Sequence, residues 1–290
     1  MPGRVSDRDE SPKSSKPFIA SDGRAPSEKS LSLNAASKEL DIRILNTTEV
    51  EYAGRIGTPE APKYRQVLAL LAFRVGTTVS IESMIDELWP SNPPRTAVTT
   101  TQTYIYGLRK IVDKLADKPL GKQVIATRRP GYILCLERES IDIHRFRDKL
   151  GTARSLAAQD AQQALREYDQ ILSCTPTVPL SDIALGPVLI SYADEIREVI
   201  LSARHERIEL ALKAGDPNMM LPELRLLTAT FPLRENFARS LMQALAATNR
   251  RAEALQVFHE VRTVLNRDLG IEPCHELRAL QEKVLRGNSR

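Results

Sequence analysis

The forty residues from Pro93 to Tyr132 read PPRTAVTTTQTYIYGLRKIVDKLADKPLGKQVIATRRPGY. Their first half predicts one long helix, because apolar or small side chains recur three, four and seven positions apart and therefore share one face. That inner face comprises Val98, Thr101, Ile105, Leu108, Val112 and Leu115. After a break at 118–122, two β-prone runs flank Arg128-Arg129-Pro130-Gly131, which indicates a hairpin with two arginines at its tip.

The outer face of this predicted helix carries hydroxyl groups and cations but no carboxylate. Between Arg95 and Gly131 there are eight Lys or Arg and two Asp, a net charge of +6, whereas the whole chain has a net charge of +4. A solvated amphipathic helix would show the same periodicity, but the adjoining basic hairpin favours a nucleic-acid ligand. Hydroxyl and guanidinium groups can reach base edges in the major groove of DNA, and neighbouring lysines and arginines can bind phosphates. The predicted DNA-binding residues are Arg95, Thr96, Thr99, Thr100, Gln102, Thr103, Tyr106, Arg109, Lys110, Lys114, Arg128 and Arg129.

The residues that precede the helix complete a small domain. Alternation of apolar and polar residues from Leu40 to Tyr52 predicts a half-buried hairpin. Two short helices follow, one at 63–74 and one after Ser80, which is placed to cap it. Trp89 closes the second helix and is expected to fill the core. Strands, three helices and a terminal hairpin in this order predict a winged helix over 39–138, with the third helix reading DNA and the hairpin as the wing.

The remainder of the chain, 139–290, is almost wholly helical in pattern. Apolar spacing predicts helices at 141–156, 161–172, 192–214, 219–230, 235–248, 252–268 and 276–285. Helical hairpins of this kind indicate tetratricopeptide-like stacking, although the second unit is longer than the first. The predicted fold is mostly α with a small β content: a winged helix-turn-helix domain followed by an all-α tetratricopeptide-like domain. The Ser/Pro/Lys-rich residues 1–38 predict a disordered tail.

Composition and missing motifs argue against several other classes of protein. There is no run of eighteen apolar residues and no apolar N-terminal stretch, so neither a membrane span nor a signal peptide is expected. Cys135, Cys174 and Cys274 are too few and too scattered for a disulfide framework or a zinc site, which fits a reduced cytoplasm. The chain contains no phosphate-binding loop, nucleophile elbow or His-Glu-x-x-His motif. We therefore expect no enzyme activity, cofactor or bound metal.

Four blocks, in this order, resemble one group of bacterial regulators. The blocks are LALLA at 68–72, IDELWP at 85–90, QTYIYGLRK at 102–110 and PGY at 130–132. They are similar to the winged helix, of the OmpR type, in the Streptomyces antibiotic regulatory proteins. Further blocks resemble the bacterial transcriptional activation domain of that family: PEL at 222–224, FPLRE at 231–235, AEAL at 252–255 and DLGIEP at 268–273. The resemblance covers about 40–286.

The chain departs from the pattern of that family at several positions. Val98, Thr99 and Gly107 stand where relatives more often carry an Arg, an Asn and an Arg, which predicts a shifted preferred repeat. Near 172–190, relatives usually show a Trp-Gly segment, whereas this chain has Ser-Cys-Thr-Pro at 173–176. The ATPase module of the larger relatives is missing.

The resemblance implies an activator of a secondary-metabolite gene cluster, acting in the cytoplasm at the nucleoid. Such a protein would bind direct repeats in double-stranded promoter DNA as a homodimer, with two copies head to tail about one helical turn apart. It would also contact the RNA polymerase holoenzyme, including its sigma subunit. On this interpretation 39–138 is the DNA-binding domain and 139–290 the activation domain, and 39–138 is expected to fold and bind a half-site alone.

Two other functions fit the residues as well. The first is a repressor with the same DNA-binding domain, whose helical half binds a small effector. The second is an adaptor whose winged helix contacts only proteins. A reconstituted transcription assay would separate the activator from the repressor, and salt-dependent binding of promoter DNA would separate both from the adaptor.

Overall fold

The computed structural model describes residues 39–215 and 217–287, so the tail expected over 1–38 lies outside the described residues. The described chain begins with a three-stranded antiparallel sheet in the order β1-β2-β3. Its strands are β1 (Leu40–Arg43), β2 (Glu49–Tyr52) and β3 (Arg55–Gly57). The hairpin predicted from period-two alternation is confirmed, because Ile42 pairs with Val50 and both side chains are buried.

The winged-helix domain continues with a second sheet in the order β4-β6-β5. Its elements are α2 (Pro62–Phe73), β4 (Val79–Ser80), α3 (Ile81–Leu88), α4 (Ala97–Ala116), α5 (Gly121–Val124), β5 (Ile125–Arg128) and β6 (Gly131–Leu134). The predicted cap is confirmed, since the Ser83 amide donates to Ser80 Oγ over 3.0 Å. Trp89 is half-buried beside Tyr104, with ring centroids 6.3 Å apart.

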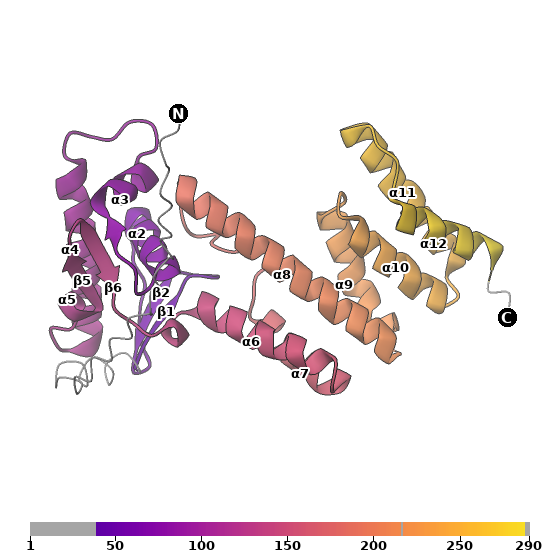
Figure 1. Ribbon diagram of the computed structural model, residues 1–290, viewed down its shortest axis with the longest axis horizontal. Coiled ribbons are helices and arrows are strands. Elements are labelled where there is room, and N and C mark those ends of the chain that lie inside the picture. The colour runs from indigo at the N-terminus through magenta and orange to yellow at the C-terminus, as the bar shows by residue number, and fades with distance from the viewer. Residues whose placement is uncertain (1–38, 216, 288–290) are drawn as a thin grey trace, which may run out of the picture.

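The rest of the described chain is helical, as predicted. After the 3-10 turn η1 (Arg138–Ser140) come α6 (Asp142–Ala157), α7 (Ala161–Ser173), α8 (Pro187–Ala214), α9 (Pro217–Thr230), α10 (Glu235–Ala247), α11 (Arg251–Leu269) and α12 (His275–Arg286). In Figure 1, α8 runs from the winged helix to α9–α12 on the other side of the molecule. Asn249 adopts a left-handed conformation (φ 61°) between α10 and α11, the helix end predicted for it.

Two buried hydrophobic clusters hold these elements together. The first contains the core of the winged helix and continues into α6, α7 and the first half of α8, including Ile141, Phe146 and Ile196. The second joins the later part of α8 to α9–α12, around Ile208, Phe237 and Phe258. The buried core is therefore continuous across residue 138, and the change from one cluster to the other falls within α8.

Glu87 of α3 explains why α8 begins at Pro187, five residues before the start that periodicity predicts. The Glu87 side chain is buried, and its carboxylate accepts hydrogen bonds from the amides of Gly186 (2.6 Å), Val188 (2.7 Å) and Leu189 (3.3 Å). These amides belong to the first turn of α8, where the helix dipole also stabilises a negative charge. A β-carbon at Gly186 would lie 2.1 Å from the Glu87 carbonyl oxygen, so this contact requires glycine.

Two carboxylates of the helical region bind the winged helix in return. Asp142 accepts from the amides of Ile44 (3.0 Å) and Leu45 (2.9 Å), and burial raises the pKa of Asp142 to about 6. Asp182 accepts from the Thr48 amide (2.8 Å) and hydroxyl (3.0 Å). These contacts fix the loop between β1 and β2 against α6 and the segment before α8.

Candidate nucleic-acid interface

Helix α4 lies at the edge of the molecule, with β5 beside it and α9–α12 at the opposite end (Figure 1). Its buried side chains are Ala97, Thr101, Ile105, Leu108, Val112, Leu115 and Ala116. The predicted inner face is confirmed except at its first residue. Val98 is 49% exposed, and Ala97 takes the core position instead. The phase of the helix explains the exchange, because Ala97 lies four residues before Thr101 and eight before Ile105.

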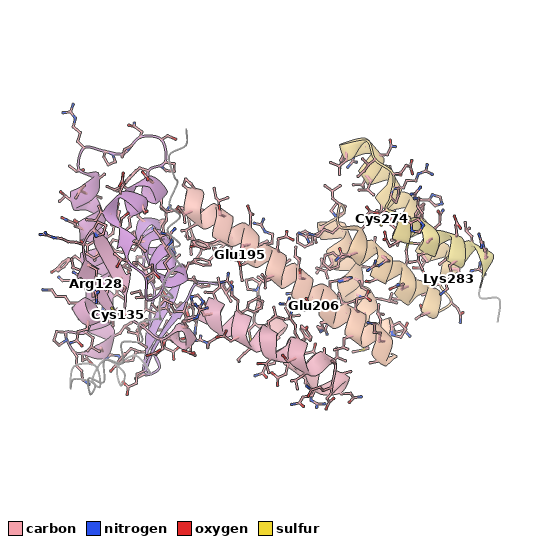
Figure 2. All side chains as sticks on the ribbon, in the orientation of Figure 1. Arg128, Cys135, Glu195, Glu206, Cys274 and Lys283 are labelled. Carbon is pink, nitrogen blue, oxygen red and sulfur yellow. The ribbon has the colours of Figure 1, made fainter. Side chains whose placement is uncertain are left out.

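The predicted DNA-binding side chains lie on or beside the outer face of α4 and at the wing. Ten of them are exposed: Arg95, Thr96, Thr99, Gln102, Thr103, Tyr106, Lys110, Lys114, Arg128 and Arg129. Thr100 and Arg109 are half-buried. Figure 2 shows Arg128 at the end of the molecule opposite Cys274 and Lys283. The structure thus brings the helix residues and the wing tip to one end of the molecule, and a role in DNA binding stays a prediction for each.

Local contacts order several of these side chains. Thr103 Oγ1 donates to the Thr99 carbonyl over 3.0 Å, and Thr100 Oγ1 lies 3.4 Å from Thr96 Oγ1. Lys110 Nζ lies 5.0 Å from the centroid of the exposed Tyr106 ring, a cation–π contact. The face therefore presents threonine methyl groups, one amide and one aromatic ring before its first lysine.

Arg109 connects the helix to the wing. Its Nε and Nη2 donate to the Ile125 carbonyl over 2.9 and 2.7 Å, and Nη2 also donates to Thr127 Oγ1. The guanidinium lies over the Tyr132 ring, 5.5 Å from its centroid, and burial lowers the pKa of Arg109. With these contacts, Arg109 is better suited to positioning the wing relative to α4 than to contacting bases.

The base of the wing is held by a close backbone approach. Arg128 pairs with Gly131 across the hairpin, and Gly131 also pairs with Ser80 of β4. A β-carbon at Gly131 would lie only 1.8 Å from the Val79 carbonyl oxygen. Glycine is therefore required, and it fixes β6, the strand that pairs with β5 directly after the two arginines.

The charges of this surface are uncompensated. Within the described residues, none of the eight Lys and Arg between 95 and 131 forms an ion pair with a carboxylate. Asp117 pairs with Arg55, and Asp113 accepts the Gly121 amide. In α6–α12, by contrast, many arginines pair with carboxylates, as Arg147 does with Glu195 and Arg154 with Glu206. Positive potential is therefore concentrated at α4 and the wing.

Tyr64 is a residue of this surface that sequence reasoning missed. It packs against Gly107, where a β-carbon would lie 2.7 Å from the tyrosine ring, and meets Tyr104 edge-to-face at 5.4 Å. The signal available in the sequence was the glycine itself, since an interior helical glycine usually marks a close contact.

Two other kinds of site are absent from 39–215 and 217–287. No helix there is long and apolar enough to cross a membrane. No group of three or more His, Cys, Asp or Glu side chains in the same ranges is placed to hold a metal ion.

Comparison with known proteins matches both halves of the chain. Residues 141–285 match the family described as bacterial transcriptional activator domain, and residues 59–134 match the family described as transcriptional regulatory protein, C terminal. The regulatory protein DnrI of Streptomyces peucetius is 33% identical over 254 residues, which cover 86% of this chain and 93% of DnrI. The regulatory protein AfsR of Streptomyces griseus is 30% identical over 266 residues, 91% of this chain but only 26% of AfsR.

A solved structure has a similar fold. It is Mycobacterium tuberculosis EmbR in complex with a low affinity phosphopeptide, with 29% identity and a TM-score of 0.77. The match covers 86% of this chain and 65% of that one, so this chain spans just under two thirds of the solved EmbR chain.

Proposed function

Since the chain belongs to the Streptomyces antibiotic regulatory protein family, a family of transcriptional regulators, we propose that it activates a secondary-metabolite gene cluster by binding promoter DNA. Helix α4 enters the major groove, where its outer face reads base edges, and Arg128 and Arg129 bind phosphates beside it. The regulator acts at the nucleoid and needs no cofactor.

One observation carries this proposal: the cations of α4 and the wing have no carboxylate partners within the described residues, whereas arginines elsewhere are widely paired. Unpaired cations on one surface are those that release counterions from DNA, which supplies most of the affinity for the duplex. The surface between them consists of hydroxyl, amide and aromatic side chains, which suits contacts with bases.

The further parts of the proposal concern assembly. Two copies bind direct repeats head to tail, with half-sites one helical turn or about 34–36 Å apart. The helices beyond the winged helix then add affinity by making binding of the second copy effectively intramolecular. They also offer the RNA polymerase holoenzyme, including sigma, a surface.

The wing provides the direct test of DNA binding. We expect the double variant Arg128→Ala/Arg129→Ala to bind every DNA sequence more weakly, because its wing no longer neutralises phosphates. The slope of log affinity against log salt concentration should fall by about 0.9 for each phosphate that is left without its arginine. An electrophoretic or fluorescence titration of promoter DNA at several salt concentrations measures this slope.

The matched control is Arg267→Ala/Arg286→Ala. It removes the same total charge from two exposed arginines of α11 and α12, at the end of the molecule opposite the wing. An unchanged slope in the wing variant, or an equal fall in both variants, would remove the wing from the DNA interface.

Base reading and activation need separate measurements. Thr103→Ala should reduce discrimination between the repeat and random DNA more than it reduces binding to random DNA, with each base contact worth about 1–3 kcal/mol. In transcription reconstituted with the polymerase holoenzyme, an activator raises the transcript from a weak promoter. A lowered transcript would establish the repressor alternative.

A further inference from the structure

Val98 is an exposed apolar side chain within a polar surface. It lies in the first turn of α4, and its side chain is 49% exposed, while Ala97 and Thr101 beside it are buried. Val98 takes no part in either buried cluster. A β-branched residue is also a poorer helix former than alanine or leucine. Neither packing nor helix propensity therefore gives a reason for valine at this position.

The position of Val98 on the helix is that of a base-reading residue. Val98, Gln102 and Tyr106 follow at intervals of four, so they lie along one line of the exposed surface. Arg95, in the turn that precedes α4, is exposed as well. In helix-turn-helix proteins the N-terminal residues of the reading helix contact base edges, and this line starts there.

The major groove contains one apolar group that a valine can contact, the C5-methyl group of thymine. Valine offers neither a donor nor an acceptor, so an apolar contact with this methyl group is the base contact open to it. Gln102 supplies a polar neighbour, because its amide makes no hydrogen bond within the described residues and can pair with N6 and N7 of adenine.

We propose that Val98 is a specificity-determining residue that reads the methyl group of one thymine in each repeat. Gln102 then reads an adjacent position one helical turn further along α4. This inference rests on the proposed function, because it requires α4 to lie in the major groove.

The test removes the methyl group from the DNA and the side chain from the protein. The probe is a promoter fragment that the full chain protects in a footprint, with each thymine of one repeat replaced singly by deoxyuridine. At one thymine the unchanged protein should bind about fourfold more weakly, the value for losing burial of a single methyl group. Val98→Ala should bind the thymine probe more weakly and be insensitive to deoxyuridine at that position.

The control is Val178→Ala, the same substitution at a valine that is 53% exposed in the segment between α7 and α8. It should keep the deoxyuridine profile of the unchanged protein. Because Val98 is exposed, its alanine variant should also keep the thermal midpoint of unfolding.

Each other outcome overturns the inference. If the unchanged protein binds DNA but tolerates every deoxyuridine, no methyl group is read. If Val98→Ala and the unchanged protein give the same profile, a different residue reads the methyl group. Both results leave DNA binding intact, whereas failure to bind any promoter fragment would overturn the proposed function together with this inference.

Discussion

The junction between the winged helix and α6–α8 is built differently from the junction between α8 and α9–α12. At the first, Glu87, Asp142 and Asp182 accept hydrogen bonds mainly from backbone amides of the other region, around a continuous apolar core. At the second, Arg204 and Arg207 of α8 share the Glu223 carboxylate of α9, at 3.1 and 2.5 Å. Both junctions also have an apolar core, formed by the first cluster at one and the second cluster at the other. They differ in their polar contacts, which join carboxylates to backbone amides at the first junction and side chains to side chains at the second.

This difference indicates which parts of the molecule move together. Leaving a buried amide without its acceptor costs about 1–3 kcal/mol, whereas partly exposed ion pairs contribute little. The aromatic stack of Phe73 on Tyr192, with centroids 4.4 Å apart, adds to the first junction. The winged helix and the start of α8 should therefore move as one body, and any change of shape should occur nearer α9.

The largest expected effect on stability is that of truncating the chain after the winged helix. A chain ending at Arg138 lacks the partners of its buried surface, including Ile141 and Phe146, and leaves Glu87 without its three backbone amide donors. Each buried apolar side chain contributes about 1.5–3 kcal/mol, so exposing a few of them approaches the whole stability of a domain, about 5–15 kcal/mol. We expect this chain to be largely unfolded in circular dichroism.

A chain ending at Gly215 is the matched comparison. It retains the complete first cluster, so it should unfold cooperatively and bind a single half-site. If the chain ending at Arg138 has the same unfolding midpoint and affinity as the chain ending at Gly215, the winged helix is independent. The expectation from sequence, that 39–138 folds alone, would then hold.

The next largest effect compares one carboxylate from each junction. Glu87→Ala should lower the free energy of unfolding by about 4 kcal/mol, because it leaves several buried amides without an acceptor. Glu223→Ala should lower it by about 1 kcal/mol, because its ion pairs are partly exposed. Urea denaturation of both variants measures the difference, and equal decreases would mean that the two junctions do not differ in strength.

The smallest effect is a pH dependence at the first junction. Burial raises the pKa of Asp142 to about 6, against 3.8 in the unfolded chain. The native state therefore holds this proton where the unfolded state releases it. The resulting stabilisation is complete below about pH 4 and is lost as the pH rises to about 6. At 1.36 kcal/mol per pKa unit, it amounts to at most about 3 kcal/mol.

Buried His144 has the opposite effect. Burial lowers its pKa, so its contribution to stability is complete above pH 6.5 and is lost as the pH falls below 6.5 through the lowered pKa of the folded state. The measurement is therefore the difference between the unchanged protein and Asp142→Asn in urea unfolding from pH 4 to pH 7. The unchanged protein should lose stability relative to the variant as the pH rises. A constant difference would mean that Asp142 titrates as in water.

Local features of the fold could be predicted from the sequence because their causes are local. Periodicity located the helices. Ser80 marked the N-terminal cap of α3, and Asn249 marked the end of α10. The start of α8 could not be predicted, since its capping carboxylate lies 99 positions earlier in the chain. Periodicity also indicates that one face of a helix is buried, but not which element covers that face. The core that the winged helix shares with α6–α8 is therefore evident only in the folded chain.

The candidate site shows the same limit. The exposed outer face of α4 and the basic wing followed from spacing and charge. The prediction that Val98 lies in the core is wrong, because Val98 is exposed and Ala97 is buried. Valine is more hydrophobic than alanine, so it was assigned to the inner face. In the first turn of a helix, no earlier residue shows which of two neighbours belongs to that face. The bonds of Arg109 to Ile125 join elements whose relative positions only the folded chain defines.

Because α8 is long, a small change in its direction moves its far end by several ångströms. Its 28 residues span about 42 Å at 1.5 Å per residue, with one end fixed to the winged helix through Glu87 and the other among α9–α12. A difference of about 10° in the direction of such a helix displaces its far end by about 7 Å. That travel is about twice the 3.4 Å rise between successive base pairs. In the head-to-tail arrangement that we propose, the direction of α8 would therefore set how far from the duplex, and over which base pairs, the far ends of the two copies meet.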